Sequence, residues 1–437
     1  MTAATTSTVP AAHHGRIGVL GAAGLVAGGM IGSGVYLLPA TLAATGSIAI
    51  LGWLAAAAAA LAIAGVFIWL GRMVPDANGL ASYVRSGLGR FFALQAAFAY
   101  WVSIWAGMVA VAVAAAGALG FLFPALADPT ARLLVTLAAI WLGVAAAWAG
   151  PRTVARLEGL TLALGLLPVL LTATIGWIAF RPHIFIESWN PSDMAVGAAV
   201  TRSGLSCFWA FLGLECAAAA AGVVRDPVRN VPRATLLGVV GAAVLYIAAS
   251  VVIMGLLPNH ELAGSTAPFA DATRAVVGAG AGGAIAICVF LRTMGCLTGW
   301  TLVLAETSRG AADDGDFPAV LRTRPGEHAS AVNLLLGGAL MTVVAVLSAS
   351  PNLAQQFTII ANVVSLLALF TYVLAAGSLI RLAGGLRPAV RAGVTVTALL
   401  AIGASVVLAL AASPLEIGLS LTSVAAGGLL YLWMRRR

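Results

Sequence analysis

The sequence predicts an all-α integral membrane protein with twelve transmembrane helices, arranged as an inverted repeat of five plus five helices in which helices 1 and 6 are discontinuous. Three observations predict this class. Hydrophobic residues make up 61% of the 437-residue chain and charged residues only 9%, with a mean hydropathy of +1.03. The apolar residues fall in stretches long enough to cross a bilayer. Two of these stretches, five spans apart, are interrupted at glycine.

Spans of roughly 20 apolar residues are expected to cross the hydrocarbon layer. By this measure the spans are centred near Ser33, Ala60, Val109, Ile140, Leu167, Phe211, Tyr246, Cys296, Met341, Leu369, Ala401 and Ala425. They divide the chain into a disordered cytoplasmic tail (1–15), a first five-helix repeat (16–182), a second five-helix repeat (183–388), and helices 11 and 12 with a basic cytoplasmic C-terminus (389–437). No length is left for a soluble domain.

The basic residues predict the orientation in the membrane. All 23 are arginine, and with the N-terminus inside, 18 of them fall in cytoplasmic segments. Cytoplasmic loops carry the excess of positive charge in membrane proteins, so both termini are expected in the cytoplasm. The net charge of +8 then lies in short loops that face the anionic headgroups of the lipid bilayer, and it does not indicate a nucleic acid partner.

The first span is interrupted by a Gly-Ser-Gly turn at residues 32–34, within the run AAGLVAGGMIGSGVYLLP. A break at membrane depth leaves backbone groups unpaired, which is tolerated where they line a cavity or bind a ligand. The sixth span carries Gly213, and interrupted helices in corresponding positions of two halves indicate a substrate site between them. Close packing of the small residues against a neighbouring helix is the alternative interpretation.

Glu215 is the only one of the fifteen acidic residues that is expected deep inside a span. An ionisable group is expensive there and is by default a functional candidate. We expect Glu215 to take up and release a proton, and thereby to sense pH. A purely structural carboxylate that braces two helices by hydrogen bonds is the alternative.

Four ordered stretches carry a resemblance to a known family: GSGVYLLPATLAATGSIAILGWL (32–54), FWAFLGLECAAAAAGVVRDPVRNVPRAT (208–235), ELAGSTAPF (261–269), and GCLTGWTL with AADDGDFP (295–302, 311–318). They resemble the amino acid/polyamine antiporters of the amino acid-polyamine-organocation (APC) superfamily, closest to the arginine/agmatine and ornithine/putrescine exchangers. The resemblance implies a LeuT-like fold in the bacterial inner membrane. It also implies exchange of a basic amino acid for its decarboxylated amine by alternating access, a functional link to a cytoplasmic amino acid decarboxylase, and a homodimer.

The resemblance also implies how the substrate is held. Ser33 and Gly34 would bind its carboxylate at the positive end of a half-helix. Carbonyl groups freed by the two breaks would hold its α-ammonium group, at Met30, Trp209 and Leu212.

Aromatic residues match the family's gates. The resemblance implies that Trp209 is a lid on the outer side and that Trp300 stacks on the cationic side chain of the substrate. Tyr100 and Tyr372 match gating tyrosines, and Glu215 matches a pH-responsive glutamate. A tryptophan that only fills apolar space, or a buried tyrosine with a satisfied hydroxyl, is the plainer alternative.

Four positions depart from the arginine-specific pattern. Met108 stands where the arginine exchanger has an asparagine, with Ser103 and Ile104 nearby, and Val364 aligns with a pocket serine, although Ser365 is adjacent. A guanidinium group prefers several acceptors. Lysine/cadaverine exchange, ornithine/putrescine exchange, and a proton-coupled or uniport permease for a less basic amino acid are therefore open alternatives to arginine/agmatine exchange.

Arg292 lies two helical turns before Trp300 in the eighth span. Three placements are open for it. It faces the vestibule and repels basic substrates, it pairs with Glu416, or it extends to the membrane interface.

The polar residues also argue against a metal site, a cofactor site and enzymatic activity. No histidine is expected inside a span, the four cysteines lack metal-ligand spacing, and no pair of carboxylates lies at membrane depth. We therefore expect no metal, no cofactor and no enzymatic activity. A channel is disfavoured because no filter motif accompanies the broken helices.

Overall fold

The computed structural model describes residues 18–32, 34–75, 77, 79–215, 224–322 and 330–436, and these form a bundle of helices. The predicted N-terminal tail lies outside the described residues. The helices are α1 (Val19–Met30), α2 (Gly34–Ala43), α3 (Ala49–Met73), α4 (Leu80–Leu88), α5 (Arg90–Leu122), η1 (Pro124–Ala127), α6 (Pro129–Trp148), α7 (Pro151–Thr174), η2 (Ile175–Ala179), α8 (Pro182–Glu187), α9 (Val196–Phe208), η3 (Trp209–Phe211), α11 (Pro227–Leu256), α12 (Asn259–Ala263), α13 (Pro268–Val277), α14 (Ala279–Asp313), η5 (Ala319–Leu321), α15 (Ala331–Leu347), α16 (Leu353–Leu382), η6 (Ala383–Gly385), α17 (Pro388–Ala409) and α18 (Pro414–Arg435).

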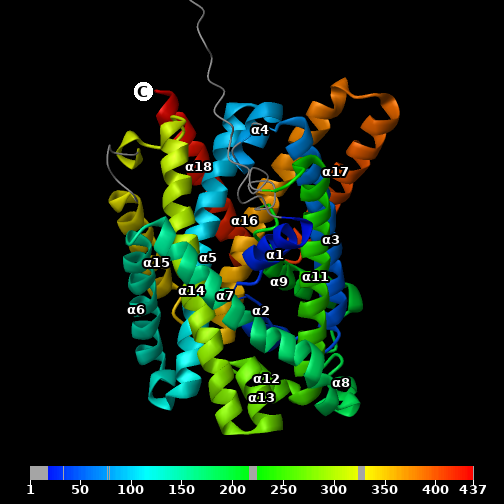
Figure 1. The fold of residues 1–437 in the computed structure, drawn as a ribbon, viewed down its shortest axis with the longest axis vertical. Helices are drawn as coiled ribbons and strands as arrows, with labels where there is room; N and C mark the ends of the chain where they lie inside the picture. Colours follow the sequence, from blue (N-terminus) through cyan, green and yellow to red (C-terminus); the bar gives the residue numbers. More distant parts are fainter. Residues whose placement is uncertain are drawn as a thin grey trace, which may run out of the picture.

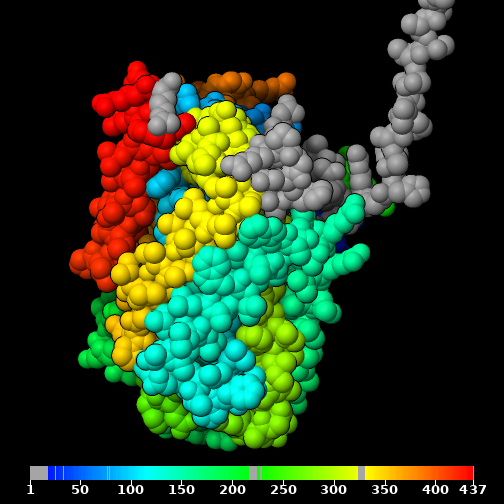
Figure 2. Space-filling view, turned by 90° about the vertical axis from the view of Figure 1, so that its left-hand side faces the viewer, coloured from blue at the N-terminus to red at the C-terminus, as the bar shows by residue number. Residues whose placement is uncertain are grey.

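Helix α5 is the centre of the bundle, and it packs against both α14 and α16 (Figure 1). In the apolar stretch of α5, 89% of the residues are buried, against only 6% for α18. Helices α6 and α15 lie side by side on the face shown in Figure 2, with α18 along its edge. Leu134 and Leu142 of α6 are 62% and 60% exposed. An apolar outer surface of this kind is suited to contact with lipid.

Nine of the described helices are long and apolar enough to cross a membrane, and the bent α1–α2 pair makes a tenth. Two predicted spans do not pass this test. Helix α15 has only 17 residues, and the sixth span consists of the 13-residue α9, η3 and a turn before residues 216–223, which lie outside the described part. Ser33 lies outside the described residues, and the other eleven predicted centres fall on described helices in the expected order, but the count of twelve stays a prediction.

The two predicted interruptions are present in the described chain. Helix α1 ends at Met30, α2 begins at Gly34, and the two axes differ by 50°. Helix α9 ends at Phe208, and after η3 the chain turns at Gly213, whose φ is +98°. Glycine adopts such a positive φ without the steric penalty that side chains impose.

The two interruptions meet in space. A Cβ atom at Gly213 would lie 2.9 Å from the backbone oxygen of Gly29, and one at Gly34 would overlap the indole ring of Trp209. Glycine is thus required at both positions because backbone and ring approach them too closely for a side chain. The turn at Gly213 therefore packs against the last turn of α1, directly before the first break.

The two ends of the molecule differ in their arginine content. Helix α4, the C-terminus and the α16–α17 connection lie at the upper end of Figure 1, whereas α8, α12 and α13 lie at the lower end. The upper set carries Arg85, Arg90, the arginines at 381, 387 and 391, and the C-terminal arginines. This arrangement matches the arginine distribution used above to predict orientation.

Candidate substrate site

A pocket of about 70 Å³ lies where the two breaks meet α5, α14 and α16. A cavity of this size holds a few water molecules. Its walls are formed by Gly29, Met30, Gly32, Gly34, Tyr100, Ser103, Ile104, Gly107, Met108, Val111, Trp209, Leu212, Glu215, Cys296, Trp300, Val364, Ala368 and Tyr372.

Every residue that the sequence predicted for substrate binding or gating lies in these walls, with one exception. Ser33 lies outside the described residues. Of the two adjacent α16 residues, Val364 lines the pocket, while Ser365 does not and its buried hydroxyl has no hydrogen-bond partner among the described residues.

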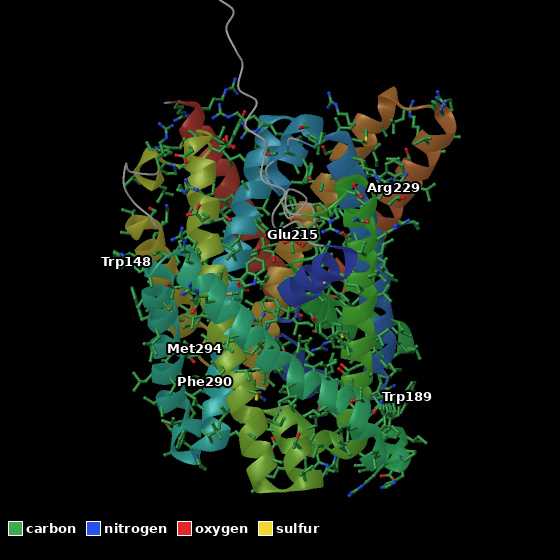
Figure 3. All side chains as sticks on the ribbon, in the orientation of Figure 1. Trp148, Trp189, Glu215, Arg229, Phe290 and Met294 are labelled. Atoms are coloured by element: carbon green, nitrogen blue, oxygen red, sulfur yellow. The ribbon has the colours of Figure 1, made fainter. Side chains whose placement is uncertain are left out.

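Glu215 is shared by two tyrosines from different helices. Tyr100 of α5 donates its hydroxyl hydrogen to Oε1 at 3.0 Å, and Tyr372 of α16 donates to Oε2 at 2.6 Å. Figure 3 shows Glu215 inside the bundle, between Arg229 towards the upper end and Trp189 at the lower end. Both carboxyl oxygens of Glu215 therefore accept a hydrogen bond from the protein. The carboxylate thus ties three elements together at the wall of the pocket.

Trp209 forms another part of the wall. Its side chain is 8% exposed and packs edge to face on Phe357, with ring centroids 6.0 Å apart. The indole also lies against Gly107 of α5, where an added Cβ would be 3.0 Å from it. The ring therefore spans from the α9 break to α5 and α16, across the pocket.

Two of the three predicted carbonyl groups already accept a backbone hydrogen bond. The carbonyl of Met30 accepts from the amide of Gly32 at 2.8 Å, and that of Trp209 accepts from Leu212 at 3.2 Å. A carbonyl oxygen has two lone pairs, so each retains one for a ligand.

Five wall residues were missed by the sequence analysis: Gly29, Gly107, Val111, Cys296 and Ala368. Gly107, Cys296 and Ala368 lie four positions from a predicted residue, and Val111 lies three from Met108. Residues three or four apart share one face of a helix. Applying those spacings to the predicted residues would have found these four, but not Gly29, which lies next to the first break.

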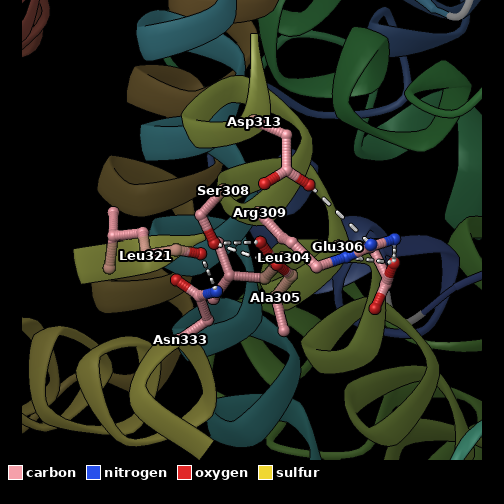
Figure 4. Close-up of polar contacts among 8 residues, drawn as sticks. All are labelled: Leu304, Ala305, Glu306, Ser308, Arg309, Asp313, Leu321 and Asn333. Atoms are coloured by element: carbon pink, nitrogen blue, oxygen red, sulfur yellow. Dashed lines mark hydrogen bonds and ion pairs between the residues drawn. The ribbon is translucent and has the colours of Figure 1, made fainter. Parts of the chain in front are cut away.

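A second cavity, of about 620 Å³, adjoins the first at Tyr100, which lines both. We call it the acidic vestibule, because its walls include Glu306, Asp313, Asp314 and Asp316. Figure 4 shows Arg309 of α14 between Glu306 and Asp313, with which it forms ion pairs. Asp316 pairs with Arg85 and Arg90 next to α4, which places the vestibule at the arginine-rich end.

The three placements considered for Arg292 are wrong. Its side chain is only 1% exposed, so it reaches neither a vestibule nor the membrane interface. Glu416 is bound instead by Asn362, whose amide donates to Oε1 at 2.8 Å, and by the backbone amide of Ser413. The Arg292 guanidinium points at the carboxyl end of α1, where it donates to backbone carbonyl groups. The reason is long-range packing, since α14 passes directly beside the first break.

Comparison with known proteins identifies the family. Residues 17–432 match the family model for amino acid permeases. The chain is 33% identical over 374 residues to the cadaverine/lysine antiporter of Escherichia coli K12, which covers 84% of each chain. It is 32% identical to the putrescine transporter PotE of the same strain, over 84% of each chain, and 32% identical to PotE of Haemophilus influenzae, over 84% of this chain and 85% of the other. The chain is therefore a multi-pass membrane transporter rather than an enzyme, and it belongs to the amino acid permease family of the APC superfamily.

Proposed function

We propose that this protein exchanges a basic amino acid for its decarboxylated amine by alternating access, with lysine/cadaverine or ornithine/putrescine as the pair. The two kinds of relative that it matches are named as a cadaverine/lysine antiporter and a putrescine transporter. The observation that carries the proposal is Glu215, a carboxylate at the pocket wall that is held by the hydroxyl groups of Tyr100 and Tyr372.

The walls of the pocket suit an alkyl ammonium better than a guanidinium. Met108, Val111, Val364 and Ala368 offer apolar surface to a chain of methylene groups. Trp300 offers an aromatic face for a cation, an interaction that contributes roughly 0.5 to 2 kcal/mol. A guanidinium has five donors that seek acceptors, and Met108 supplies none where the arginine exchanger has an asparagine. Arginine/agmatine exchange is therefore the less favoured pairing.

The roles that we propose for the other pocket residues depend on the two helix breaks. The amide groups at Ser33 and Gly34 bind the carboxylate of the amino acid, because they begin a half-helix. The carbonyl groups of Met30, Trp209 and Leu212 hold the α-ammonium group, and the Trp209 ring closes the outer side. The gate formed by Glu215 and its two tyrosines closes the inner side and responds to pH.

The orientation proposed from the arginines makes the acidic vestibule cytoplasmic. Both termini then lie in the cytoplasm, and the twelve spans form two inverted repeats of five followed by two helices. Carboxylates around a concave surface raise the local concentration of cations, so the vestibule favours entry of the outgoing diamine. A cytoplasmic decarboxylase would supply that diamine, and a homodimer is the proposed assembly.

Obligate exchange is tested in proteoliposomes. Uptake of labelled lysine or ornithine is expected only when the lumen contains a substrate such as lysine, cadaverine, ornithine or putrescine, because an empty carrier reorients slowly. Arginine and agmatine serve as the comparison pair. Equal uptake into empty and loaded vesicles contradicts exchange and supports uniport or proton symport, and preference for agmatine contradicts the proposed pairing.

Exchange of a monovalent amino acid for a divalent diamine moves one positive charge outward in each cycle. That charge is worth about 2.3 kcal/mol per 100 mV. An inside-negative potential of that size should therefore reduce the equilibrium accumulation of lysine against cadaverine by about 50-fold. Lysine/lysine exchange moves no net charge and is the control. The measurement is uptake into vesicles clamped with potassium and valinomycin, and an unchanged accumulation ratio contradicts a 1:1 exchange of these two charges.

A further inference from the structure

A chain of hydrogen bonds connects three helices behind the wall of the pocket. Ser206 of α9 donates from its hydroxyl to Oδ1 of Asn362 of α16 at 3.0 Å, and Nδ2 of the same amide donates to Oε1 of Glu416 of α18 at 2.8 Å. The three residues are buried, with exposed fractions of 4%, 5% and 6%. They do not belong to the pocket wall, so the roles proposed above leave them without a function.

This chain of hydrogen bonds lies close to the pocket at two points. Trp209, whose ring closes the outer side in the function proposed above, follows Ser206 by three positions, and Val364 follows Asn362 by two. Because η3 directly continues α9, a movement of α9 away from α16 carries the Trp209 ring with it. The Ser206–Asn362 contact is therefore placed to control the lid without touching the substrate.

Glu416 determines which way the Asn362 amide faces. A carboxylate accepts hydrogen bonds through both oxygens, and Oε2 of Glu416 already accepts from the backbone amide of Ser413 at 2.7 Å. The donor end of the Asn362 amide therefore faces α18, and its acceptor end faces α9. Among the described residues no basic side chain forms an ion pair with Glu416, so these hydrogen bonds stabilise its carboxylate in the interior.

Ser206 has a second acceptor available within its own helix. Serine in a helix commonly donates to the carbonyl group four positions earlier, as Ser203, in the same helix, does to Ala199. When α9 moves away from α16, the Ser206 hydroxyl can turn to the carbonyl of Arg202 in the same way, because a carbonyl oxygen has two lone pairs. The donor is then not left unpaired, so the bond to Asn362 can break and form again at low cost.

We propose that Ser206 and Asn362 form a releasable latch that holds α9 against α16 while the outer side of the pocket is closed, and that Glu416 is the positioning residue that directs the Asn362 amide towards α9. In the outward-open state the latch is broken, and the Ser206 hydroxyl is bonded within its own helix. This inference rests on the alternating access proposed above, but not on the identity of the substrate. It gives α18, which lies outside the two predicted repeats, a role in the transport cycle.

Ser206→Ala removes the latch and leaves the bond between Asn362 and Glu416 in place. The outward-open state should become about fivefold more populated, as expected for the loss of one hydrogen bond. Cys296 lines the pocket, so the rate at which its thiol is labelled reports access. The membrane-impermeant reagent MTSET, a methanethiosulfonate with a trimethylammonium group, should label Cys296 of S206A about fivefold faster than that of the wild type in right-side-out vesicles. In inside-out vesicles it should label S206A no faster than the wild type. Mass spectrometry of the Cys296 peptide gives both rates.

The same shift is expected in transport. The half-saturating concentration of external substrate should fall in S206A and that of internal substrate should rise, because the apparent affinity on each side scales with the fraction of carriers that face it. A side chain that only supports the fold would lower the melting temperature or the maximal rate. It would not move the two half-saturating concentrations in opposite directions.

Ser203 provides a matched control for this variant. It is also buried in α9, at 1% exposure, but its hydroxyl bonds within the helix. Ser203→Ala should therefore be labelled from each side at the wild-type rate.

A double variant tests the positioning role of Glu416. In Glu416→Gln one amide oxygen has to serve the donors of both Asn362 and Ser413, so the Asn362 amide loses its fixed direction. E416Q should be labelled from outside at a rate between those of the wild type and S206A. Because Glu416 acts through the latch, the E416Q/S206A double variant should be labelled like S206A.

Two results overturn the inference. A folded S206A protein that is labelled from outside at the rate of S203A shows that Ser206 and Asn362 form no latch. Effects of E416Q and S206A that add in the double variant show that Glu416 does not act through Asn362. S206A and S203A each remove one oxygen atom, so this pair decides the first question even where E416Q does not fold. Labelling needs no transported substrate, so failure of the latch is distinguishable from failure of the proposed exchange, which the wild-type vesicle assay tests separately.

Discussion

Replacing Glu215 with glutamine should reduce exchange of a diamine by about 100-fold at neutral pH. A hydrogen bond to a charged group contributes about 1.5–3 kcal/mol, and a 100-fold change corresponds to about 2.7 kcal/mol. The amide keeps one acceptor oxygen, so either Tyr100 or Tyr372 also loses its acceptor. Because glutamine mimics a protonated glutamate, the deficit should shrink as the pH falls and wild-type Glu215 takes up a proton. The measurement is initial exchange rate against pH for both proteins.

Two control variants separate the effect of the Glu215 charge on the rate from the effect of its tyrosine hydrogen bonds and from that of the acidic vestibule. Tyr372→Phe keeps the carboxylate but removes the 2.6 Å hydrogen bond, so its rate should fall less and should keep the pH dependence of the wild type. Glu306→Gln removes one of the four acids of the vestibule, which pairs with Arg309, so its rate should fall much less than that of E215Q and should keep the pH dependence of the wild type. An E215Q variant that exchanges diamines normally at neutral pH would show that Glu215 has only a structural role.

A methyl group at Gly213 should abolish most of the transport and lower the thermal stability. Alanine at a φ of +98° is strained, by about 1–3 kcal/mol, and its Cβ would lie 2.9 Å from the backbone oxygen of Gly29. Backbone cannot rotate away as a side chain can, so the two breaks have to separate. We expect Gly213→Ala to reduce the exchange rate about 100-fold, because small displacements of a binding geometry have effects of that size. The variant should also lose the stabilisation that bound substrate gives the wild type.

Gly315 separates strain from contact in this experiment. Its φ is also positive, at +76°, but a Cβ there meets nothing within 4 Å. Gly315→Ala should therefore show the cost of the backbone conformation, about 1–3 kcal/mol, while keeping exchange. The readouts are the melting temperature of each purified variant and its exchange rate. If G213A and G315A behave alike, contact between the two breaks does not matter for function.

Local pattern was sufficient for much of the site. The Gly-Ser-Gly turn and Gly213 predict interruptions because glycine has a low helix propensity, and both interruptions are present in the structure. Residues such as Tyr100, Trp209, Trp300 and Tyr372 could be placed by resemblance, since a motif fixes position along the chain. The span count could not be fixed in the same way, because apolar length alone does not say where the short α9 and α15 begin or end.

Helix rotation was beyond the reach of the sequence. Neighbouring residues on a helix point about 100° apart. A shift of one position therefore decides whether a side chain lines the pocket or packs against a neighbouring helix. For that reason Val364 and Ser365 could be distinguished only in the folded chain, where Val364 lines the pocket. The acidic vestibule likewise depends on residues from α4, α5 and α14 that are far apart in sequence.

The sequence by itself determined that this is a helical membrane protein with two broken spans and a carboxylate between them, because composition, glycine breaks and lone charges act locally. Only the tertiary structure decided what the buried charges contact. Glu215 is held by tyrosines of two other helices, and Arg292 reaches across 261 positions of sequence to the carbonyl of Ile31. A buried charge must find a partner, but which partner it finds is set by the packing of helices that meet only in the folded molecule.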